Sequence, residues 1–348
     1  MLFTLLAFVL VLGVLVLAHE AGHYFTAKAF GVKVNEFGIG YPPRLFAVKR
    51  GETEYSINML PLGGFVKLSG EEDPNAPDSL ASKSHAKRII VLASGAVINA
   101  LLPLILLTGA FIVPHDVATG TIEVVAVSPN SPAEAAGIVE GDVILSFAGR
   151  ELDNNIVLGR VIFMNLGEPS EMEILRADGT TSIVTVTPRW EPPEEQGAVG
   201  LGTTTTDVVI ERVSEPFFKA VSMGFKESMD LLVLFKNSIL SLFTGTAEGG
   251  LAGPIGIAQI TGDVARAGLA PLLEFTALLS LNLAILNLLP IPALDGGRIA
   301  FVVVEWARRG KRIDPQTEGK IHFIGFAFLI ALIIMVTFND IIRIVGGG

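Results

Sequence analysis

The sequence contains no cysteine, and only 17% of its 348 residues are charged. Without cysteine, the chain has no disulfides, no thiolate zinc ligands and no cysteine nucleophile. The absence of cysteine is compatible with either an oxidising or a reducing compartment. The 25 Lys and Arg residues form no basic block of the kind that nucleic-acid-binding proteins use. We therefore expect no nucleic-acid partner.

Hydrophobic residues are abundant instead, because they make up 50% of the chain and give a mean hydropathy of +0.58. Soluble domains rarely reach that value. Four stretches hold the roughly 20 apolar residues that a hydrocarbon core requires, and they are Leu2–Ala29, 89–113, 272–294 and 321–338. A cleaved signal peptide is the alternative for the first, but no Lys or Arg precedes it and no clear cleavage site follows. The sequence predicts an α-helical polytopic membrane protein with four transmembrane helices in a lipid bilayer.

Lys and Arg predict the orientation of these helices, since they collect in cytoplasmic loops. The connections after the first and third helices are rich in them, for example at Lys33, Arg44, Arg308 and Arg312. The connection after the second helix is dominated by Asp and Glu. We therefore expect both termini and the middle region to be extracytoplasmic.

The middle region begins with residues 115–202, which have the pattern of a small α+β domain. Its expected elements are strands at 121–127 and 142–148, a short helix from Ser131-Pro132, a helix at 155–165, and a hairpin with its turn at Asp178-Gly179. A soluble domain is thus expected to be inserted between two pairs of transmembrane helices.

The rest of the chain flanks this domain. Residues 203–270 form a connecting region whose stretch 216–244 has apolar residues at helical spacing. Such an amphipathic helix lies either at the membrane surface or against the soluble domain, and the sequence leaves both possibilities open. Residues 1–114 and 271–348 are expected to form the membrane domain.

The strongest chemical signal is His19-Glu20-Ala21-Gly22-His23, within the first helix. Residues four apart share one face of a helix, so both imidazoles can reach one metal ion. The glutamate between them is close enough to take a proton from a water at the metal. Ionisable residues inside a membrane helix are costly. This cluster therefore indicates a catalytic zinc site rather than interfacial residues without a function at a helix end.

A catalytic zinc takes three protein ligands and keeps one open position. His85, His115 and His322 are available, but each is more typical of a surface or interface than of a ligand. Asp295 is the better candidate, since it ends an apolar span in backbone interrupted by prolines and glycines. A helix-terminating Asp-Gly-Gly turn is the simpler alternative. The third helix enters from the same side as the first, and therefore brings Asp295 to a similar depth as His19.

A second unusual stretch, residues 54–68, is apolar for a cytoplasmic loop and reads as two short strands around Pro61-Leu62-Gly63-Gly64. A helical substrate must be extended before water can attack its peptide bonds. A strand edge beside the metal could hold it extended by main-chain pairing. An ordinary cytoplasmic hairpin is the alternative.

Taken together, these motifs resemble those of the site-2 protease family of intramembrane metalloproteases, in particular its bacterial RseP-like group (regulator of sigma-E protease). The resemblance rests on HEAGH, FGIGYPPRLF, LPLGGFVKLSGE, GAVINALL, GPIGIAQITG and NLLPIPALDGGR. It implies Zn2+ held by His19, His23 and Asp295, with Glu20 as general base. It also implies a membrane-reentrant β-hairpin at 54–68, and substrate contacts that we assign to Asn287, Asn282, Gly63, Gly64 and Phe65.

The resemblance further implies that residues 115–202 adopt a PDZ fold, for which SPAEAAGIVEGDVILSFAGREL is typical. The expected function is cleavage of single-span membrane proteins, such as anti-sigma factors or remnant signal peptides, in a bacterial inner membrane. Peptide tails are possible ligands of the PDZ domain. The main alternative is a non-catalytic membrane scaffold that binds tails by strand addition. A zinc transporter fits less well, because the other spans offer few polar residues.

Overall fold

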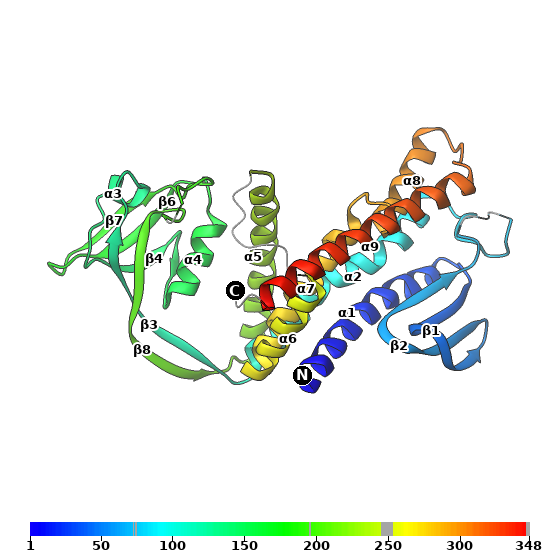
Figure 1. Cartoon of the computed structure of the whole chain (residues 1–348), viewed down its shortest axis with the longest axis horizontal. Coiled ribbons are helices and arrows are strands. Elements are labelled where there is room, and N and C mark those ends of the chain that lie inside the picture. Colours follow the sequence, from blue (N-terminus) through cyan, green and yellow to red (C-terminus); the bar gives the residue numbers. More distant parts are fainter. Residues whose placement is uncertain (72, 74, 195, 245–252, 346–348) are drawn as a thin grey trace. The chain divides into compact units, whose positions relative to one another are not determined.

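The computed structural model describes residues 1–71, 73, 75–194, 196–244 and 253–345 of the chain (Figure 1). The chain forms two compact units. The first comprises residues 1–110, 220–224 and 251–348, and the second comprises residues 111–219 and 225–250.

Helices dominate the first unit. They are α1 (Leu2–Ala29), α2 (His85–Ile112), α6 (Pro254–Ala267), α7 (Leu269–Leu288), α8 (Asp295–Ala307) and α9 (Pro315–Val345). Among the described residues, α1, α2, α7 and α9 are long and apolar enough to cross a membrane. The result agrees with a polytopic membrane protein, as the hydropathy pattern predicts.

The third apolar stretch ends differently from the expectation. We expected a helix over 272–294, but α7 ends at Leu288 and α8 begins at Asp295. Pro290 and Pro292 explain the break, because proline lacks an amide hydrogen and disfavours helical backbone at the residue before it. The intervening turn places Asp295 at the start of a new helix.

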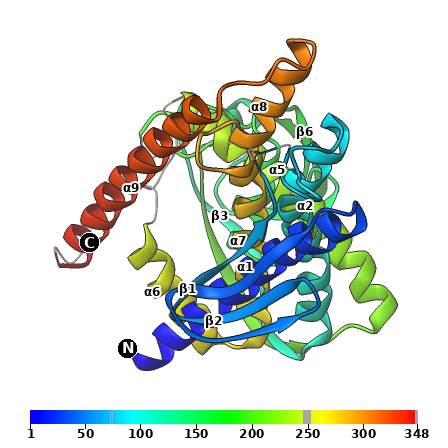
Figure 2. The same cartoon turned by 90° about the vertical axis from the view of Figure 1, so that its right-hand side faces the viewer.

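A β-sheet lies beside α1 (Figures 1 and 2). Its two strands, β1 (Val34–Arg50) and β2 (Thr53–Leu68), are antiparallel, and each bends back on itself. Residues 36–39 therefore pair with both 54–57 and 64–67, and the sheet has four rows. The bend in β1 needs Gly40, which has φ 79° and would place a β-carbon 2.6 Å from the Leu60 carbonyl oxygen. We expected a hairpin of two short strands within 54–68, and this is wrong in its pairing. Residues 36–39 of β1 lie between the two arms, 54–57 and 64–67, and pair with both.

The second unit is built on an antiparallel sheet of order β7-β6-β4-β3-β8, with β5 paired to β4. Its elements are β3 (His115–Val127), α3 (Pro132–Ala135), β4 (Val143–Phe147), β5 (Arg150–Glu151), α4 (Asn155–Met164), β6 (Ser170–Leu175), β7 (Thr181–Val186) and β8 (Leu201–Val213). Phe147, Met172 and Ile174 are fully buried in its core. Because β8 pairs with β3 up to Val213, the sheet extends past residue 202, where we expected the domain to end.

Helix α5 (Phe217–Thr244) covers the stretch expected to be amphipathic. Its Asp230 receives two hydrogen bonds from Arg150, at 2.5 and 2.7 Å. The Asn237 amide donates to the carbonyl oxygen of Phe163 at 2.7 Å. One side of α5 therefore packs against the sheet and α4 within the second unit, whereas Phe225 on α5 stays exposed.

Candidate metal centre

Three side-chain atoms converge in the first unit. His19 Nε2 lies 3.0 Å from Asp295 Oδ2, His23 Nε2 lies 3.3 Å from the same oxygen, and the two imidazole nitrogens are 3.1 Å apart. They are the only group of three or more His, Asp or Glu residues among the described residues with the spacing of a metal site. The structure thus brings together the three residues that the resemblance names as ligands.

The distances fit a tetrahedral zinc ion. Zinc binds imidazole nitrogen and carboxylate oxygen at about 2.0–2.2 Å, so neighbouring donors of a tetrahedron lie about 3.3 Å apart. The edges of the observed triangle, 3.0, 3.1 and 3.3 Å, are close to that value. Two imidazole nitrogens and one carboxylate oxygen direct their lone pairs toward one point, where a cation would be stabilised. This set of nitrogen and oxygen donors suits zinc.

The α-helix explains why both imidazoles point the same way, since His19 and His23 are one turn apart on α1. Both residues are 7% exposed. The Nδ1 of His23 lies 2.9 Å from the backbone carbonyl oxygen of Val91, and a hydrogen on Nδ1 therefore donates to that oxygen. This contact leaves Nε2 as the nitrogen available to a metal, as is usual for metal-binding histidines.

The turn between α7 and α8 carries Asp295 to the histidines. Its Ala293 amide donates a hydrogen bond to His322 Nδ1 at 2.8 Å, across from α9. Gly296 and Gly297 allow the first turn of α8 to press against the preceding backbone, since their β-carbons would lie 2.1 Å from the Leu289 oxygen and 2.4 Å from the Ile291 oxygen. A side chain at either position would clash with this backbone, so the tight turn after Asp295 requires glycine at both.

The other end of α8 is tied to α2 by charge. Glu305 accepts a hydrogen bond from Arg88 at 2.6 Å, with His85 and Arg312 each 3.3 Å from its carboxylate. Burial alone would raise the pKa of Glu305, but the hydrogen bond and charge of Arg88 outweigh it and lower that pKa. Helix α8 is thus held at both ends, at Asp295 and at Glu305.

Glycines on α1 and α2 let these helices meet behind the metal centre. A β-carbon on Gly95 would lie 2.4 Å from His23 Nε2 and 2.7 Å from His19 Nε2. One on Gly22 would lie 2.5 Å from the Ser94 carbonyl oxygen. Sequence reasoning missed Gly95, although a glycine within an apolar span is a signal of close approach.

Glu20 lies beside the three candidate ligands, and the charges of His19, His23 and Asp295 act on it. The backbone of Val66 on β2 also acts electrostatically on its carboxylate. A β-carbon on Gly64 would lie 3.6 Å from Glu20 Cγ, so β2 passes directly alongside. The carboxylate therefore stands between the metal centre and the outer row of the sheet.

The proposed substrate-contact residues lie in different places. Gly63 begins the outer row of β2 with φ 126°, and the Phe65 ring stacks on Tyr41 with ring centroids 6.3 Å apart. Asn282 and Asn287 lie on α7, outside the group of three candidate ligands. The side-chain oxygen of Asn282 is buried without a hydrogen-bond partner among the described residues.

The remaining histidines take other roles. His85 pairs with Glu305, and the Nδ1 of His115 lies 2.8 Å from the Val113 carbonyl oxygen in the second unit. His322 is hydrogen-bonded to the turn before Asp295. These are the surface and interface positions that the sequence predicts for them.

Comparison with known proteins agrees with the geometry. The model of the family described as Peptidase family M50 matches residues 7–332 of the chain. A putative zinc metalloprotease of Clostridium perfringens is 37% identical over 345 residues, which cover 98% of each chain. The zinc metalloprotease RasP of Geobacillus kaustophilus is 30% identical over 97% of each chain. The regulator of sigma-W protease RasP of Bacillus subtilis is 29% identical over 98% of this chain and 99% of its own.

Proposed function

The chain belongs to peptidase family M50, and we propose that it cleaves single-span membrane proteins within or near the bilayer. It is a site-2-type zinc metalloprotease, as its relatives are. The observation that carries the proposal is the triangle of His19, His23 and Asp295 donor atoms, with Glu20 beside it. A scaffold without catalysis would have no need of this arrangement.

The chemistry divides between the metal and the chain. A zinc ion held by His19, His23 and Asp295 would supply Lewis acidity toward the scissile carbonyl and toward a water. Glu20 acts as the general base that takes a proton from this water and then delivers it to the leaving amine. The Glu20 side chain lies beside Gly64 of β2, and this contact keeps the base near the metal centre.

The outer row of β2 is the proposed substrate platform. Residues 64–67 pair with β1 on one side, and Gly64 lies beside the Glu20 side chain. An extended substrate segment that pairs with this outer edge would bring its peptide bonds to Glu20. Gly63, Gly64 and Phe65 would then contact substrate backbone, with Asn282 and Asn287 as contacts from α7.

We further propose that the second unit, which contains the expected domain 115–202, is a PDZ-type domain outside the cytoplasm. It would restrict access of substrates with bulky outer domains, and peptide tails are its candidate ligands. Anti-sigma-factor-like proteins and remnant signal peptides fit these limits. Both termini would then also lie on the extracytoplasmic side of a bacterial inner membrane, in agreement with the Lys and Arg pattern.

The test is cleavage of a model single-span substrate by the purified full chain in detergent. Glu20→Gln should lower the rate at least a hundredfold while zinc stays bound, because it removes the base but no ligand. Glu140→Gln, on the exposed surface of the second unit, is the matched control and should cleave at the wild-type rate. Wild-type cleavage by Glu20→Gln would overturn the mechanism.

Zinc content separates this function from the scaffold. Purified wild type should hold one zinc ion, and His19→Ala should lose both the metal and the activity. A protein that holds no zinc and is unaffected by His19→Ala would be a scaffold instead.

A further inference from the structure

A cavity of about 380 Å3 lies between α1 and one face of the β1–β2 sheet. Its lining is almost wholly apolar and aromatic, and Phe25, Phe46 and Val48 around it are exposed by 69%, 61% and 46%. Ligand pockets have volumes of about 300–1,000 Å3 and such linings. The cavity therefore has the size and chemistry of a binding site and is open to its surroundings.

The cavity is separate from the metal centre. Ala21 and Phe25 line it from α1, whereas His19 and His23 face the metal centre from the same helix. At about 100° per residue, Ala21 lies about 200° around the helix axis from each histidine. The helix itself thus stands between the cavity and the reacting atoms, so the cavity is not a subsite for the segment being cut.

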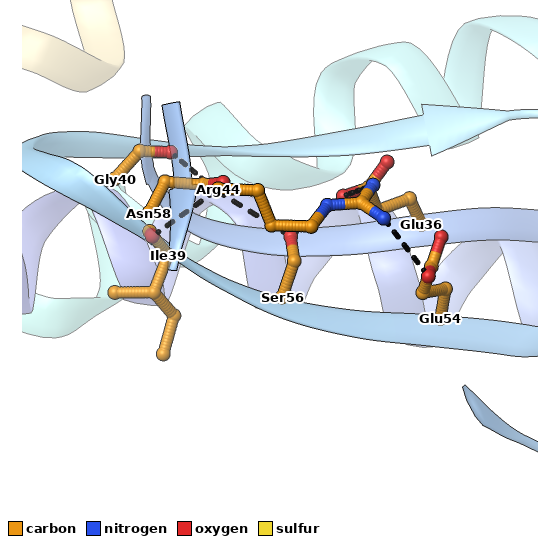
Figure 3. Close-up of polar contacts among 7 residues, drawn as sticks. All are labelled: Glu36, Ile39, Gly40, Arg44, Glu54, Ser56 and Asn58. Atoms are coloured by element: carbon orange, nitrogen blue, oxygen red, sulfur yellow. Dashed lines mark hydrogen bonds and ion pairs between the residues drawn. The ribbon is translucent and has the colours of Figure 1, made fainter. Parts of the chain in front are cut away.

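The sheet has two chemically different faces. Phe37, Ile39, Val48, Tyr55 and Ile57 line the cavity on one face. Figure 3 shows polar contacts of the same sheet, in which the Arg44 guanidinium donates to Glu36 at 2.8 Å and to Glu54 at 2.9 Å, and the Ser56 hydroxyl donates to Glu36 at 2.6 Å. The acids gathered by Arg44 alternate along their strands with the cavity residues. The sheet is therefore amphipathic, with its apolar face toward the cavity.

Positive charge collects at one end of the cavity. Along the edge row, Phe46, Val48 and Arg50 project to the same face because strand side chains alternate. On α1, Lys28 follows Tyr24 by one turn, and its Nζ lies 5.9 Å from the Tyr24 ring centroid. Both walls thus change from apolar to cationic in the same direction.

Two hydroxyls mark the same end. The Tyr24 and Tyr55 oxygens are 2.6 Å apart, and the charges of Lys28 and Arg50 both act on the Tyr55 hydroxyl. Lys28 is paired with Glu52 at 2.6 Å, which offsets its charge. Arg50 therefore gives this end its net positive character. One tyrosine hydroxyl donates to the other, so one hydroxyl hydrogen remains to donate to an anion.

We propose that this cavity binds one anionic phospholipid, with an acyl chain between α1 and the sheet and its phosphate near Arg50 and the tyrosine hydroxyls. The order of apolar wall, aromatic hydroxyls and cation matches the order of acyl chain, interface and phosphate in a leaflet. Basic pockets on the cytoplasmic side of membrane proteins hold anionic headgroups in this way. The cationic end lies in the loop that the Lys and Arg pattern puts in the cytoplasm.

The experiment is native mass spectrometry of the full chain in detergent, titrated with phosphatidylglycerol and with phosphatidylcholine of identical acyl chains. Wild type should bind the first phosphatidylglycerol at least fivefold more tightly than phosphatidylcholine. Arg50→Gln should remove that preference, whereas Arg308→Gln, an exposed arginine after α8, should keep it. Val48→Trp fills the cavity and should weaken the binding of both lipids at least fivefold.

Val97→Trp is the matched control, since Val97 on α2 is also 46% exposed, and it should bind lipid as wild type does. Thermal unfolding checks each variant, and Ala21→Leu narrows the cavity from the helix side if Val48→Trp folds poorly. Equal binding of the two lipids by wild type would overturn the proposal. Wild-type binding by the cavity-filled variants, or displacement of the lipid by a transmembrane substrate peptide, would do the same.

Discussion

Gly95 lies directly against His23, so that a β-carbon on Gly95 would sit 2.4 Å from the imidazole Nε2. That nitrogen is one of the three atoms that face the candidate metal position. Helix α2 thus forms a wall of the metal centre at Gly95, and it also holds His23 through the Val91 carbonyl. The site depends on the packing of two helices as much as on the motif of one.

Gly95→Ala should therefore displace both imidazoles and weaken zinc binding at least tenfold, with a matching loss of cleavage. Gly109→Ala is the control on the same helix, because a β-carbon there would make an ordinary 3.4 Å contact with Leu273. Zinc stoichiometry and cleavage rate of the two variants check this prediction. Full zinc content in Gly95→Ala would contradict it.

Gly296→Ala should act on the third candidate ligand. A β-carbon at this position would lie 2.1 Å from the Leu289 carbonyl oxygen, so the turn must open and Asp295 must move away from the histidines. We expect zinc affinity to fall at least tenfold. Gly319→Ala, with open space around its β-carbon, should leave zinc affinity unchanged. Competition with a chelator of known affinity measures both, and equal values would show that the turn tolerates a methyl group.

The sequence predicts the chemistry of this protein better than its packing. His19 and His23 are four residues apart, so helical periodicity alone predicts that they share a face. Asp295 is 276 residues from His19, and it stood out only as a carboxylate ending an apolar span. The protease class and the family that these residues indicated are confirmed by the family match. The ligand roles of the three residues stay predictions until bound metal is measured.

Contacts through space were not predictable in the same way. Gly95 has no sequence pattern that names its partner, since close approach of two helices depends on how they cross. Strand β1 was missed because Pro42 and Pro43 interrupt its alternation, and proline argues against a strand interior. Its pairing on both sides with a bent β2 is a property of the folded sheet.

Glu305 gives a pH-dependent contribution to stability. The pKa of Glu305 is lowered in the folded protein, because Arg88 overcomes the effect of burial. The ionised carboxylate therefore stabilises the fold fully above its unfolded-state pKa, and this stabilisation is lost as the pH falls through its folded-state pKa. Glu305→Gln should cost about 2 kcal/mol at pH 7. The difference from wild type should shrink below about pH 4.3, the ordinary pKa of glutamate.

Unfolding in detergent at pH 7 and at pH 3.5 checks this prediction. Glu71→Gln, which breaks the more exposed pair with Arg298, should cost less than about 1 kcal/mol and serves as the control. A difference for Glu305→Gln that stays constant with pH would assign the effect to packing rather than to charge.

The pairing of Arg150 with Asp230 joins α5 to the sheet of the second unit. The two charged groups share two hydrogen bonds, and the Asp230 side chain is only 8% exposed. The hydrogen bond to Asp230 also raises the pKa of Arg150. Arg150→Met leaves a buried carboxylate without its cation, so it should release α5 at a cost of about 3 kcal/mol.

Hydrogen exchange of residues 226–244 measures this release, and Arg150→Met should speed exchange there while β4 and β6 stay protected. The double variant Arg150→Met/Asp230→Leu removes both charges and should restore slow exchange, because an apolar pair of similar volume can replace a buried ion pair. Slow exchange in the single variant would mean that Asn237 alone holds the helix through its bond to Phe163. In that case Asn237 holds α5, and the ion pair of Asp230 with Arg150 does not contribute to joining α5 to the sheet.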